Sequence, residues 1–236
     1  GVDTSAVRVI PEVYTVSFFA NTDSENNQIG SFYTGAMAYS KGYTLAEALT
    51  EPPDLVVISP GDPTAMIEMA DECQACSYPF LFDPSQQVIW LDGDFLRHGI
   101  DRCRLLIVNA YEWEMIARKT NLTLQDLVRE GKTVIVTHGN DGSHIHAGGE
   151  HYAVPVFPVE KVADPTGVGD AYRAGLLKGI ACGFDWPLSG RIAALAAAYV
   201  LEQRGTQNHQ YTLAEFVARF RTIFDDEGRL DAWLKK

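Results

Sequence analysis

The stretch DPTGVGDAYRAGLL, residues 164–177, combines a glycine-rich turn with the start of an apolar helix. Gly167 and Gly169 come just before Asp170, and Tyr172 and Leu176 follow at the spacing of one helix face. The start of a helix has free N–H groups and about half a positive charge, so it attracts anions. Two interpretations follow. Asp170 is the anion that caps the helix, or the turn binds a foreign anion and Asp170 acts chemically beside it.

The turn differs from the two common nucleotide-binding loops. It lacks the Gly-Lys-Ser/Thr of a P-loop and the third glycine of the dinucleotide pattern GxGxxG. A carboxylate beside a phosphate site repels the phosphate unless it has a chemical task. One such task is to accept the proton of an attacking hydroxyl during phosphoryl transfer, which otherwise depends mainly on positioning and charge stabilisation.

Composition restricts the possible partners. The chain has 236 residues, 46% of them apolar, and a formal net charge of −12, which predicts a globular protein with a sizeable core. Binding of nucleic acid or of an anionic membrane would need clustered Lys and Arg, so we expect neither partner. A small anionic substrate is still compatible with this net charge, because its binding depends on the local electric field at the site. No apolar run reaches the roughly 18 residues of a membrane span, and the first residues do not resemble a signal peptide.

The four cysteines do not predict a metal site. Cys73 and Cys76 form a CxxC, whereas Cys103 and Cys182 stand alone, so a second ligand pair at zinc spacing is missing. We expect free thiols and a cytoplasmic protein.

Apolar runs alternate with stretches of helical period, which predicts an α/β fold with a mainly parallel central sheet in a single domain over residues 1–236. The predicted strands are 13–20, 54–60, 79–84, 104–110 and 133–139. Residues 133–159 lack helical period and contain the turn Asn-Asp-Gly, so we expect an antiparallel edge there. The valine-containing stretch 158–163 is expected to be a strand that leads into the glycine turn.

Several helices have clear sequence signals. Thr-Leu-Ala-Glu occurs at 44–47 and at 212–215 and predicts a capping box at each place. A helix is expected directly after the strand at 104–110, and another over 189–203 that ends with Gly205 as its C-cap. A third follows residue 212, with an apolar stripe that we assign to core packing: Leu213, Phe216, Val217, Phe220 and Phe224.

The residues DPTGVGDAYRAG resemble the C-terminal signature of the ribokinase-like, or PfkB, family of carbohydrate and nucleoside kinases, Asp-Thr-x-Gly-Ala-Gly-Asp. The resemblance implies a layered α/β/α domain and makes Asp170 the catalytic base. The sequence departs from the pattern at Pro165 and at residue 168, but the turn and the acid remain. By the same resemblance, an anion hole for the transferred phosphate is formed by Gly167, Val168 and Gly169.

Two further stretches fit this family in order. Asn109 and Glu112 resemble its Asn-x-x-Glu motif, which implies that they organise Mg²⁺ and phosphate, partly through water. Judged without the resemblance, Asn109 is a turn former at a strand end and Glu112 an ordinary acid in a first helical turn. The second stretch, VTHGNDG, resembles the Thr-x-Gly-x-x-Gly segment that borders ATP, through Thr137, Gly139 and Gly142. On its own it is a β-turn, in which His138 is either an exposed loop residue or an ATP contact.

The C-terminal AALAAAYVLEQRGTQNH resembles the helix and loop that close over adenine in this family. Ala194 and Ala198 would let a flat base approach, although tight helix packing explains small residues equally well. By the same resemblance, Asp164 with backbone near Gly205 would hold a monovalent cation such as K⁺.

The acceptor region FFANTDSENNQIGSFYTGAM looks most like the adenosine and nucleoside kinase branch, which implies that Asn27 and Gln28 bind a ribose or a base. We therefore expect an ATP- and Mg²⁺-dependent kinase that phosphorylates the 5′-hydroxyl of a nucleoside such as adenosine. One alternative is a sugar kinase of the same family acting on ribose or fructose. The other is a non-catalytic nucleotide-binding or dimerisation module.

The resemblance spans nearly the whole chain but not the whole family pattern. Family members usually begin with a strand, a Gly-Gly motif, a substrate-binding Asp and a small β lid, and this sequence starts at GVDTSAVRVI. We therefore expect an N-terminally truncated kinase in which the small β lid is absent. A homodimer is compatible with the family, although its members often dimerise through that lid.

Overall fold

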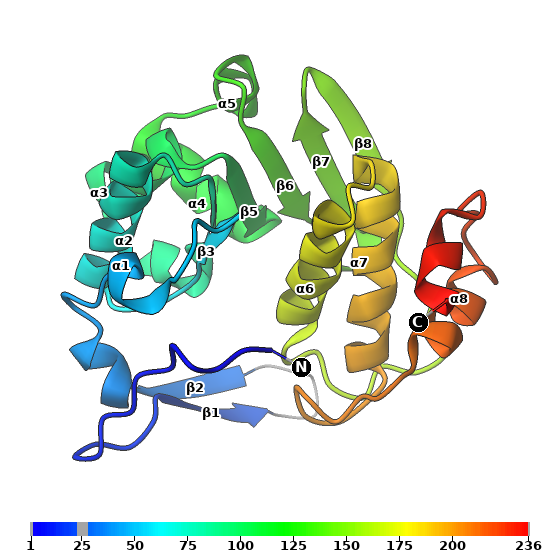
Figure 1. Ribbon diagram of the computed structural model, residues 1–236, viewed down its shortest axis with the longest axis horizontal. Helices are drawn as coiled ribbons and strands as arrows, with labels where there is room; N and C mark the ends of the chain where they lie inside the picture. Colours follow the sequence, from blue (N-terminus) through cyan, green and yellow to red (C-terminus); the bar gives the residue numbers. More distant parts are fainter. Residues whose placement is uncertain (1, 23–27, 236) are drawn as a thin grey trace. The chain divides into compact units, whose positions relative to one another are not determined.

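The structure is a computed structural model that describes residues 2–22 and 28–235. The chain divides into two compact units, Gly1–Thr123 and Leu124–Lys236, which are described separately (Figure 1).

The first unit begins with a small sheet of its own. Strands β1 (Ser17–Thr22) and β2 (Gln28–Tyr33) pair antiparallel, with Phe18 opposite Phe32. The prediction that residues 13–20 form a strand of the central sheet is therefore wrong. A central strand would bury its aromatic side chains, whereas Phe18 and Phe19 are 49% and 63% exposed.

A parallel sheet forms the core of the first unit. Its strands β3 (Val56–Ile58), β4 (Phe80–Phe82) and β5 (Leu105–Asn109) lie side by side in that order. All three residues of β4 are buried, as expected for a strand covered on both faces. The connecting helices are α2 (Pro63–Cys76), α3 (Gly93–Arg102) and α4 (Ala110–Thr120), and shorter elements are η1 (Gly35–Tyr39), α1 (Leu45–Ala48) and η2 (Ser85–Ile89).

The second unit contains the antiparallel edge that the sequence predicts. After α5 (Leu124–Arg129), strands β6 (Thr133–Thr137), β7 (Ser143–Ala147) and β8 (Glu150–Val154) pair antiparallel, and η3 (Gly139–Asp141) makes the predicted turn. Among the described residues, no strand leads directly into the glycine turn: residues 158–163 are irregular, so the prediction of a strand there is wrong. This segment is bound to the end of α7 and not to a strand, since the Ala163 N–H donates to the Leu201 carbonyl.

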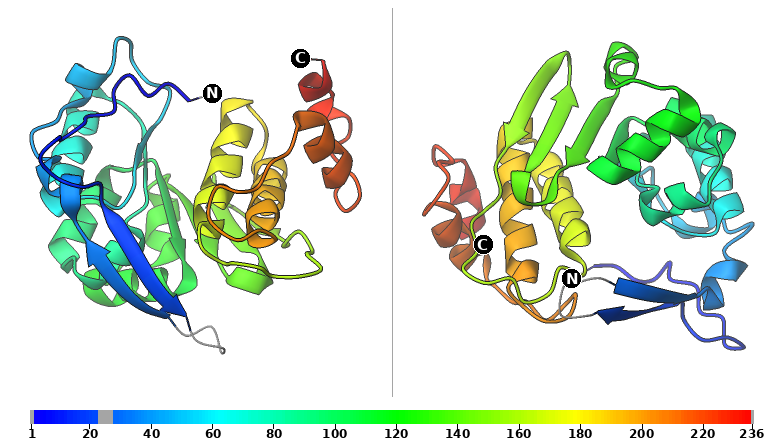
Figure 2. Two further views of the ribbon diagram at one scale, coloured as in Figure 1. Left: turned by 90° about the horizontal axis from the view of Figure 1, so that it is seen from below. Right: turned by 180° about the vertical axis from the view of Figure 1, so that it is seen from behind.

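Two long helices, α6 (Val168–Ala181) and α7 (Trp186–Leu201), run side by side in the second unit (Figure 1, Figure 2). They approach closely at glycines: a Cβ on Gly175 would lie 2.7 Å from the Ala193 Cα, and one on Gly179 would lie 2.7 Å from the Ser189 Cα. The chain ends with α8 (Leu213–Phe220) and η4 (Arg229–Leu234).

Helix ends confirm some of the capping signals and correct others. Thr212 and Glu215 form the full capping box of α8, whereas Thr44 caps the four-residue α1 by accepting the Glu47 N–H at 3.3 Å. The predicted C-cap at Gly205 is wrong: α7 ends at Leu201 with Glu202 as its C-cap. Leu213 is 40% exposed rather than part of the core stripe, because it is the first residue of α8 and lines a cavity.

The alternation of parallel strands and helices, followed by an antiparallel edge, confirms the α/β class. The single domain and the cytoplasmic location stay predictions. Among the described residues the four cysteines form no disulfide, and Cys73 is buried whereas Cys76 is exposed. Among the described residues, the helices lack the combination of length and apolarity that crossing a membrane requires.

Candidate active site at the start of helix α6

Asp170 lies in the first turn of α6, where the glycine turn ends. The N-cap of this helix is Gly167, whose left-handed backbone (φ 83°, ψ 0°) offers no side chain to cap the N–H groups. Within the described residues, the carboxylate of Asp170 accepts its hydrogen bond from Arg173, one turn further along, and not from a backbone N–H. The Asp170 side chain is 76% exposed. Asp170 is therefore available to a ligand, and it does not make the hydrogen bond of a helix cap.

The glycine turn packs against the loop that follows α7. A Cβ on Gly167 would lie 2.9 Å from the Thr206 Cβ, so both the space and the positive φ require glycine. Asp164 joins the same two segments, because its carboxylate accepts the Thr166 N–H at 2.9 Å and the Gly205 N–H at 3.0 Å. These backbone hydrogen bonds lower the pKa of Asp164.

The structure thus brings Asp164 and Gly205 together, as the resemblance implied for a cation site. Both carboxylate oxygens already accept an N–H, but an anionic oxygen has a further lone pair that a monovalent cation can use. The residues fit such an ion, and its binding stays a prediction.

The residues of the expected anion hole form the entry to α6. The Val168 N–H donates a long hydrogen bond of 3.4 Å to the Pro165 carbonyl. The N–H groups of the first helical turn have no acceptor within the helix, and the dipole favours a negative group in front of them. Gly169 carries no side chain, so an anion could approach this backbone closely.

A cavity of about 460 Å³ within the second unit extends along one face of α6 from this turn. Gly167 and Asp170 line its end, and Lys178 lies two turns further along the same face. Its apolar walls come from helices α6, α7 and α8 and from η4: Ala171, Ala174, Gly175, Ile192, Ala196, Leu213, Phe216 and Trp233. Polar groups come from the loop between α7 and α8: Thr206, Gln207, His209 and Tyr211. An apolar cavity with a few polar groups at one end is typical of a small-molecule site.

A buried hydroxyl pair positions α6 on the sheet. The Tyr172 hydroxyl lies 2.6 Å from the Ser143 hydroxyl at the start of β7. Burial raises the pKa of Tyr172 to about 12, so the phenol stays protonated and the hydrogen bond persists at neutral pH. Asp170 therefore lies on a helix that is attached to strand β7 through Tyr172, two residues further along.

Asn109 and Glu112 are hydrogen-bonded to each other's backbone in the first unit. The Asn109 side chain accepts the Glu112 N–H at 2.8 Å, and the Glu112 carboxylate accepts the Asn109 N–H at 2.7 Å. They form the capping box of α4, and Glu112 is buried. This geometry uses one oxygen of Glu112, so the other can accept hydrogen bonds from metal-bound water. The pair therefore fits a water-mediated Mg²⁺ site, and that role stays a prediction.

Thr137, Gly139 and Gly142 surround the turn between β6 and β7. The His138 N–H donates to the Gly142 carbonyl at 2.8 Å. Gly142 has a φ of 88°, and a Cβ there would lie 2.1 Å from the Val154 carbonyl oxygen, which excludes any other residue. The local structure fully explains Gly142, and contact of the three residues with ATP stays a prediction.

The structure places the remaining candidates as follows. Ala194 and Ala198 are buried in the core of the second unit, and the α7 residues that line the cavity are Ile192 and Ala196. Asn27 lies outside the described residues. Gln28 begins β2, opposite Thr22.

Sequence reasoning missed Arg173 and Lys178. Both follow Asp170 at helical spacing, by three and eight residues, so the periodicity that predicts α6 also places them on its Asp170 face. The position of the polar loop 206–211 follows only from the resemblance, because a loop that is distant in sequence carries no signal of which helix it contacts.

Comparison with known proteins places this geometry in a family. The chain is 30% identical over 221 residues to the nucleoside kinase of Methanothermobacter thermautotrophicus, covering 93% of this chain and 71% of that relative. It is 32% identical over 198 residues to the nucleoside kinase of Methanocaldococcus jannaschii, covering 84% of this chain and 64% of that relative.

Solved structures show the same likeness. The nucleoside kinase of Burkholderia thailandensis, solved in complex with inosine, aligns with a TM-score of 0.87 and 36% identity over 92% of this chain and 72% of that one. The same enzyme, solved in complex with ADP-inosine, aligns with a TM-score of 0.86 and 36% identity over 92% of this chain and 67% of that one.

The model of the pfkB family of carbohydrate kinases matches residues 1–213, a range that includes the glycine turn and Asp170. The ribokinase-like fold and the prediction of a kinase are therefore confirmed. This protein belongs to the pfkB family of carbohydrate kinases.

Proposed function

We propose that the protein transfers the γ-phosphoryl group of ATP to the 5′-hydroxyl of a nucleoside, with Asp170 as the general base. The observation that carries this proposal is the position of Asp170. Its exposed carboxylate lies in the first turn of a helix whose N-cap is a glycine, at the end of a cavity large enough for part of a substrate. The nucleoside as acceptor is supported by the relatives named above, which are nucleoside kinases.

The proposed reaction needs one proton transfer. The acceptor hydroxyl gives its proton to the Asp170 carboxylate while its oxygen forms a bond to the γ-phosphorus. The bond from the γ-phosphorus to the β,γ-bridging oxygen breaks, and ADP leaves with that electron pair. General base catalysis of this kind typically contributes about 10²–10⁴-fold.

The backbone of the glycine turn supplies the complementary charge. The N–H groups that begin α6 face the developing negative charge on the transferred phosphate, and the rigid turn keeps them in place during the reaction. Asn109 and Glu112 would hold Mg²⁺ through water, and the metal neutralises charge on the phosphates when bound. Thr137, Gly139, Gly142, Ala194 and Ala198 remain the proposed ATP contacts, and Asn27 and Gln28 the proposed nucleoside contacts.

The first experiment measures ADP release from Mg·ATP with adenosine, inosine, ribose and fructose as acceptors. We expect turnover with a nucleoside. Turnover with the sugars alone would keep the proposed base and replace the acceptor by a carbohydrate. If no acceptor supports turnover while ATP binds, the protein is a nucleotide-binding module, and the proposed reaction is wrong.

The second experiment tests the base against the helix-cap interpretation with a matched pair of variants. Asp185 is a true N-cap, whose side chain accepts the Leu188 N–H at 2.9 Å at the start of α7. Asp185→Ala is expected to lower the free energy of unfolding by about 0.5–2 kcal/mol and to keep kcat. Asp170→Ala should lose most of kcat and keep both stability and ATP affinity. A stability loss without a loss of kcat in Asp170→Ala would identify it as a cap.

A further inference from the structure

Four of the six histidines of the chain lie on or next to the β6–β7–β8 sheet. They are His138, at the end of β6, and the three residues His144, His146 and His151. These last three are called the histidine cluster below. None of the proposed catalytic steps uses them.

Strand geometry explains why the cluster forms. His144 and His146 are two residues apart on β7, so their side chains point to the same face of the sheet. His151 on β8 lies directly opposite His146, which places its side chain on that face as well. The alternate residues face α7: a Cβ on Gly190 of that helix would lie 3.2 Å from the Ile145 side chain and 2.6 Å from that of Val154. The cluster therefore occupies the sheet face that α7 leaves uncovered.

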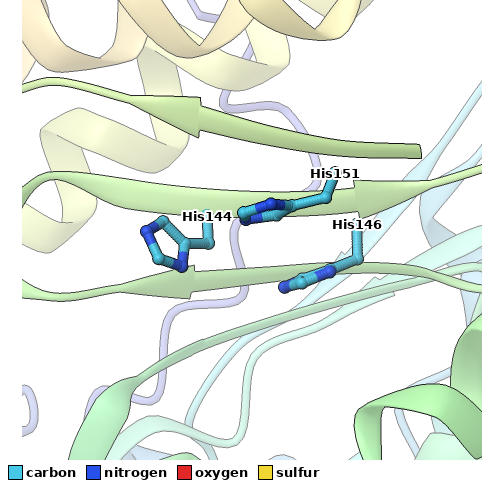
Figure 3. A group of neighbouring side chains, drawn as sticks. All are labelled: His144, His146 and His151. Carbon is cyan, nitrogen blue, oxygen red and sulfur yellow. The ribbon is translucent and has the colours of Figure 1, made fainter.

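The three imidazole rings gather in one place (Figure 3). One ring nitrogen from each histidine lies within 4.8 Å of the other two. Four nitrogens at the 2.0–2.1 Å zinc distance are about 3.4 Å apart in a tetrahedral site, so small side-chain rotations suffice to bring the three together. His144 and His146 are half-buried and His151 is exposed, so an ion can enter from solvent.

The chemical state of the cluster suits a metal. Among the described residues, none of its rings is hydrogen-bonded or ion-paired, so ring nitrogens are available as ligands. Burial, together with the neighbouring histidines, lowers the pKa of His144 and of His146, which favours the neutral imidazole that a metal needs. The net charge of −12 also attracts cations to this protein.

We propose that the histidine cluster is a binding site for a divalent transition-metal ion of the zinc class, held by His144, His146 and His151. Three neutral nitrogen ligands suit zinc, and they do not suit Mg²⁺ or Ca²⁺, which prefer oxygen. The site is thus separate in chemistry from the magnesium that accompanies ATP. Because none of the carboxylates that the structure describes is hydrogen-bonded to these rings, we expect a moderate Kd, on the order of micromolar.

The test is calorimetric titration of the protein with Zn²⁺, after chelator treatment and without a polyhistidine tag. We expect one ion per chain. His151→Ala and His144→Ala should each weaken binding at least about tenfold, since each removes one ligand. His98→Ala is the matched control, because His98 pairs with Asp71 at 2.6 Å in the first unit and should leave the affinity unchanged. Circular dichroism of each variant checks that it is folded.

A second measurement identifies the ligands directly. Co²⁺ in place of Zn²⁺ should give the intense visible absorption of a four-coordinate site in the wild type and lose it in His151→Ala. Binding that survives both cluster variants, or that disappears in Cys76→Ser instead, would overturn the proposal, since Cys76 is an exposed thiol in the only CxxC of the sequence. The absence of Zn²⁺ binding to the wild type would overturn it as well.

Discussion

The carboxylate of Asp170 accepts a hydrogen bond from the guanidinium of Arg173, one turn further along α6. The Arg173 side chain is 20% exposed and that of Asp170 is 76% exposed, so the better-buried guanidinium fixes a carboxylate that otherwise lies in solvent. A general base has to be held in one orientation, and a planar guanidinium does this better than a flexible ammonium. We therefore infer that Arg173 positions the proposed base.

Substitution of Arg173 should reduce kcat without a comparable change in substrate binding. We expect Arg173→Gln to lower kcat about tenfold and to change KM for either substrate by less than about threefold, since the lost interaction acts on the base. Arg173→Lys should restore part of kcat because it keeps the charge. Steady-state kinetics measures both parameters, and Arg191→Gln, an arginine of α7 that donates to the Asp225 carbonyl, is the matched control. A rise in KM with kcat intact would contradict this role.

The glycine turn provides a second comparison. Gly167 and Gly183 both have a positive φ, 83° and 72°, so an alanine at either position meets a backbone penalty of about 1–2 kcal/mol. Only Gly167 is also crowded, with Thr206 in the space of its Cβ, whereas nothing lies within 4 Å of that position at Gly183. Gly167→Ala should therefore displace the turn and lose activity.

Thermal unfolding and ADP-release assays on the two variants distinguish strain from function. We expect both to be destabilised and only Gly167→Ala to lose most of kcat. If Gly183→Ala lost as much activity as Gly167→Ala, general destabilisation would explain the loss, and the turn would have no special role.

Much of the second unit could be predicted because its signals are local. The glycines of the turn, the helical period after Asp170 and the capping box of Thr212 and Glu215 all act within a few residues. The family resemblance added the proximity of Asp164 and Gly205, which are 41 residues apart and which no local pattern connects.

The errors come from tertiary structure. The apolar stretch 13–20 has the composition of a central strand, yet its partner is β2, and the choice of partner depends on contacts far along the chain. Helix α7 is rich in alanine and apolar on most sides, so its sequence alone does not indicate that Ala196 lines the cavity. The predicted end of α7 is wrong for a similar reason, since Gly205 has its positive φ in a loop held by Asp164.

The capping box of α4 can be separated from a role in Mg²⁺ binding. Glu112→Gln keeps an oxygen that can accept the Asn109 N–H but removes the charge that would hold metal-bound water. We expect the free energy of unfolding to change by less than about 1 kcal/mol and the Mg²⁺ concentration for half-maximal activity to rise. Activity as a function of Mg²⁺ at fixed ATP measures the effect.

The capping box of α8 supplies the control for that experiment. Glu215 accepts the Thr212 N–H at 2.7 Å in the same arrangement, and Glu215→Gln should leave the Mg²⁺ dependence unchanged. An equal shift in both variants would show that the effect arises from helix capping, and Glu112 would then have only a structural role.

Asp226 should make the stability of the protein sensitive to acid. Its side chain is 3% exposed and accepts two hydrogen bonds of 2.8 Å from Arg221 and one of 2.8 Å from the Leu230 N–H. The Arg221 guanidinium, helped by this N–H, lowers the pKa of Asp226 from 3.8 to about 2. A carboxyl group with a lowered folded-state pKa stabilises the fold above its ordinary pKa and loses that contribution as pH falls towards the lowered value. The contribution should therefore disappear between about pH 4 and pH 2.

Urea unfolding at pH 6 and at pH 3 tests this assignment with Asp226→Asn, which keeps the shape of the side chain and removes its charge. We expect the variant to be about 1–2 kcal/mol less stable than the wild type at pH 6, with a smaller difference at pH 3, because the partly exposed Arg221 weakens the pair through solvent screening. Asp54→Asn, at an exposed position of the first unit, should follow the wild type at both pH values. A difference between Asp226→Asn and the wild type that does not shrink at pH 3 would show that packing, and not the ionised carboxylate, is what Asp226 contributes to the C-terminal segment.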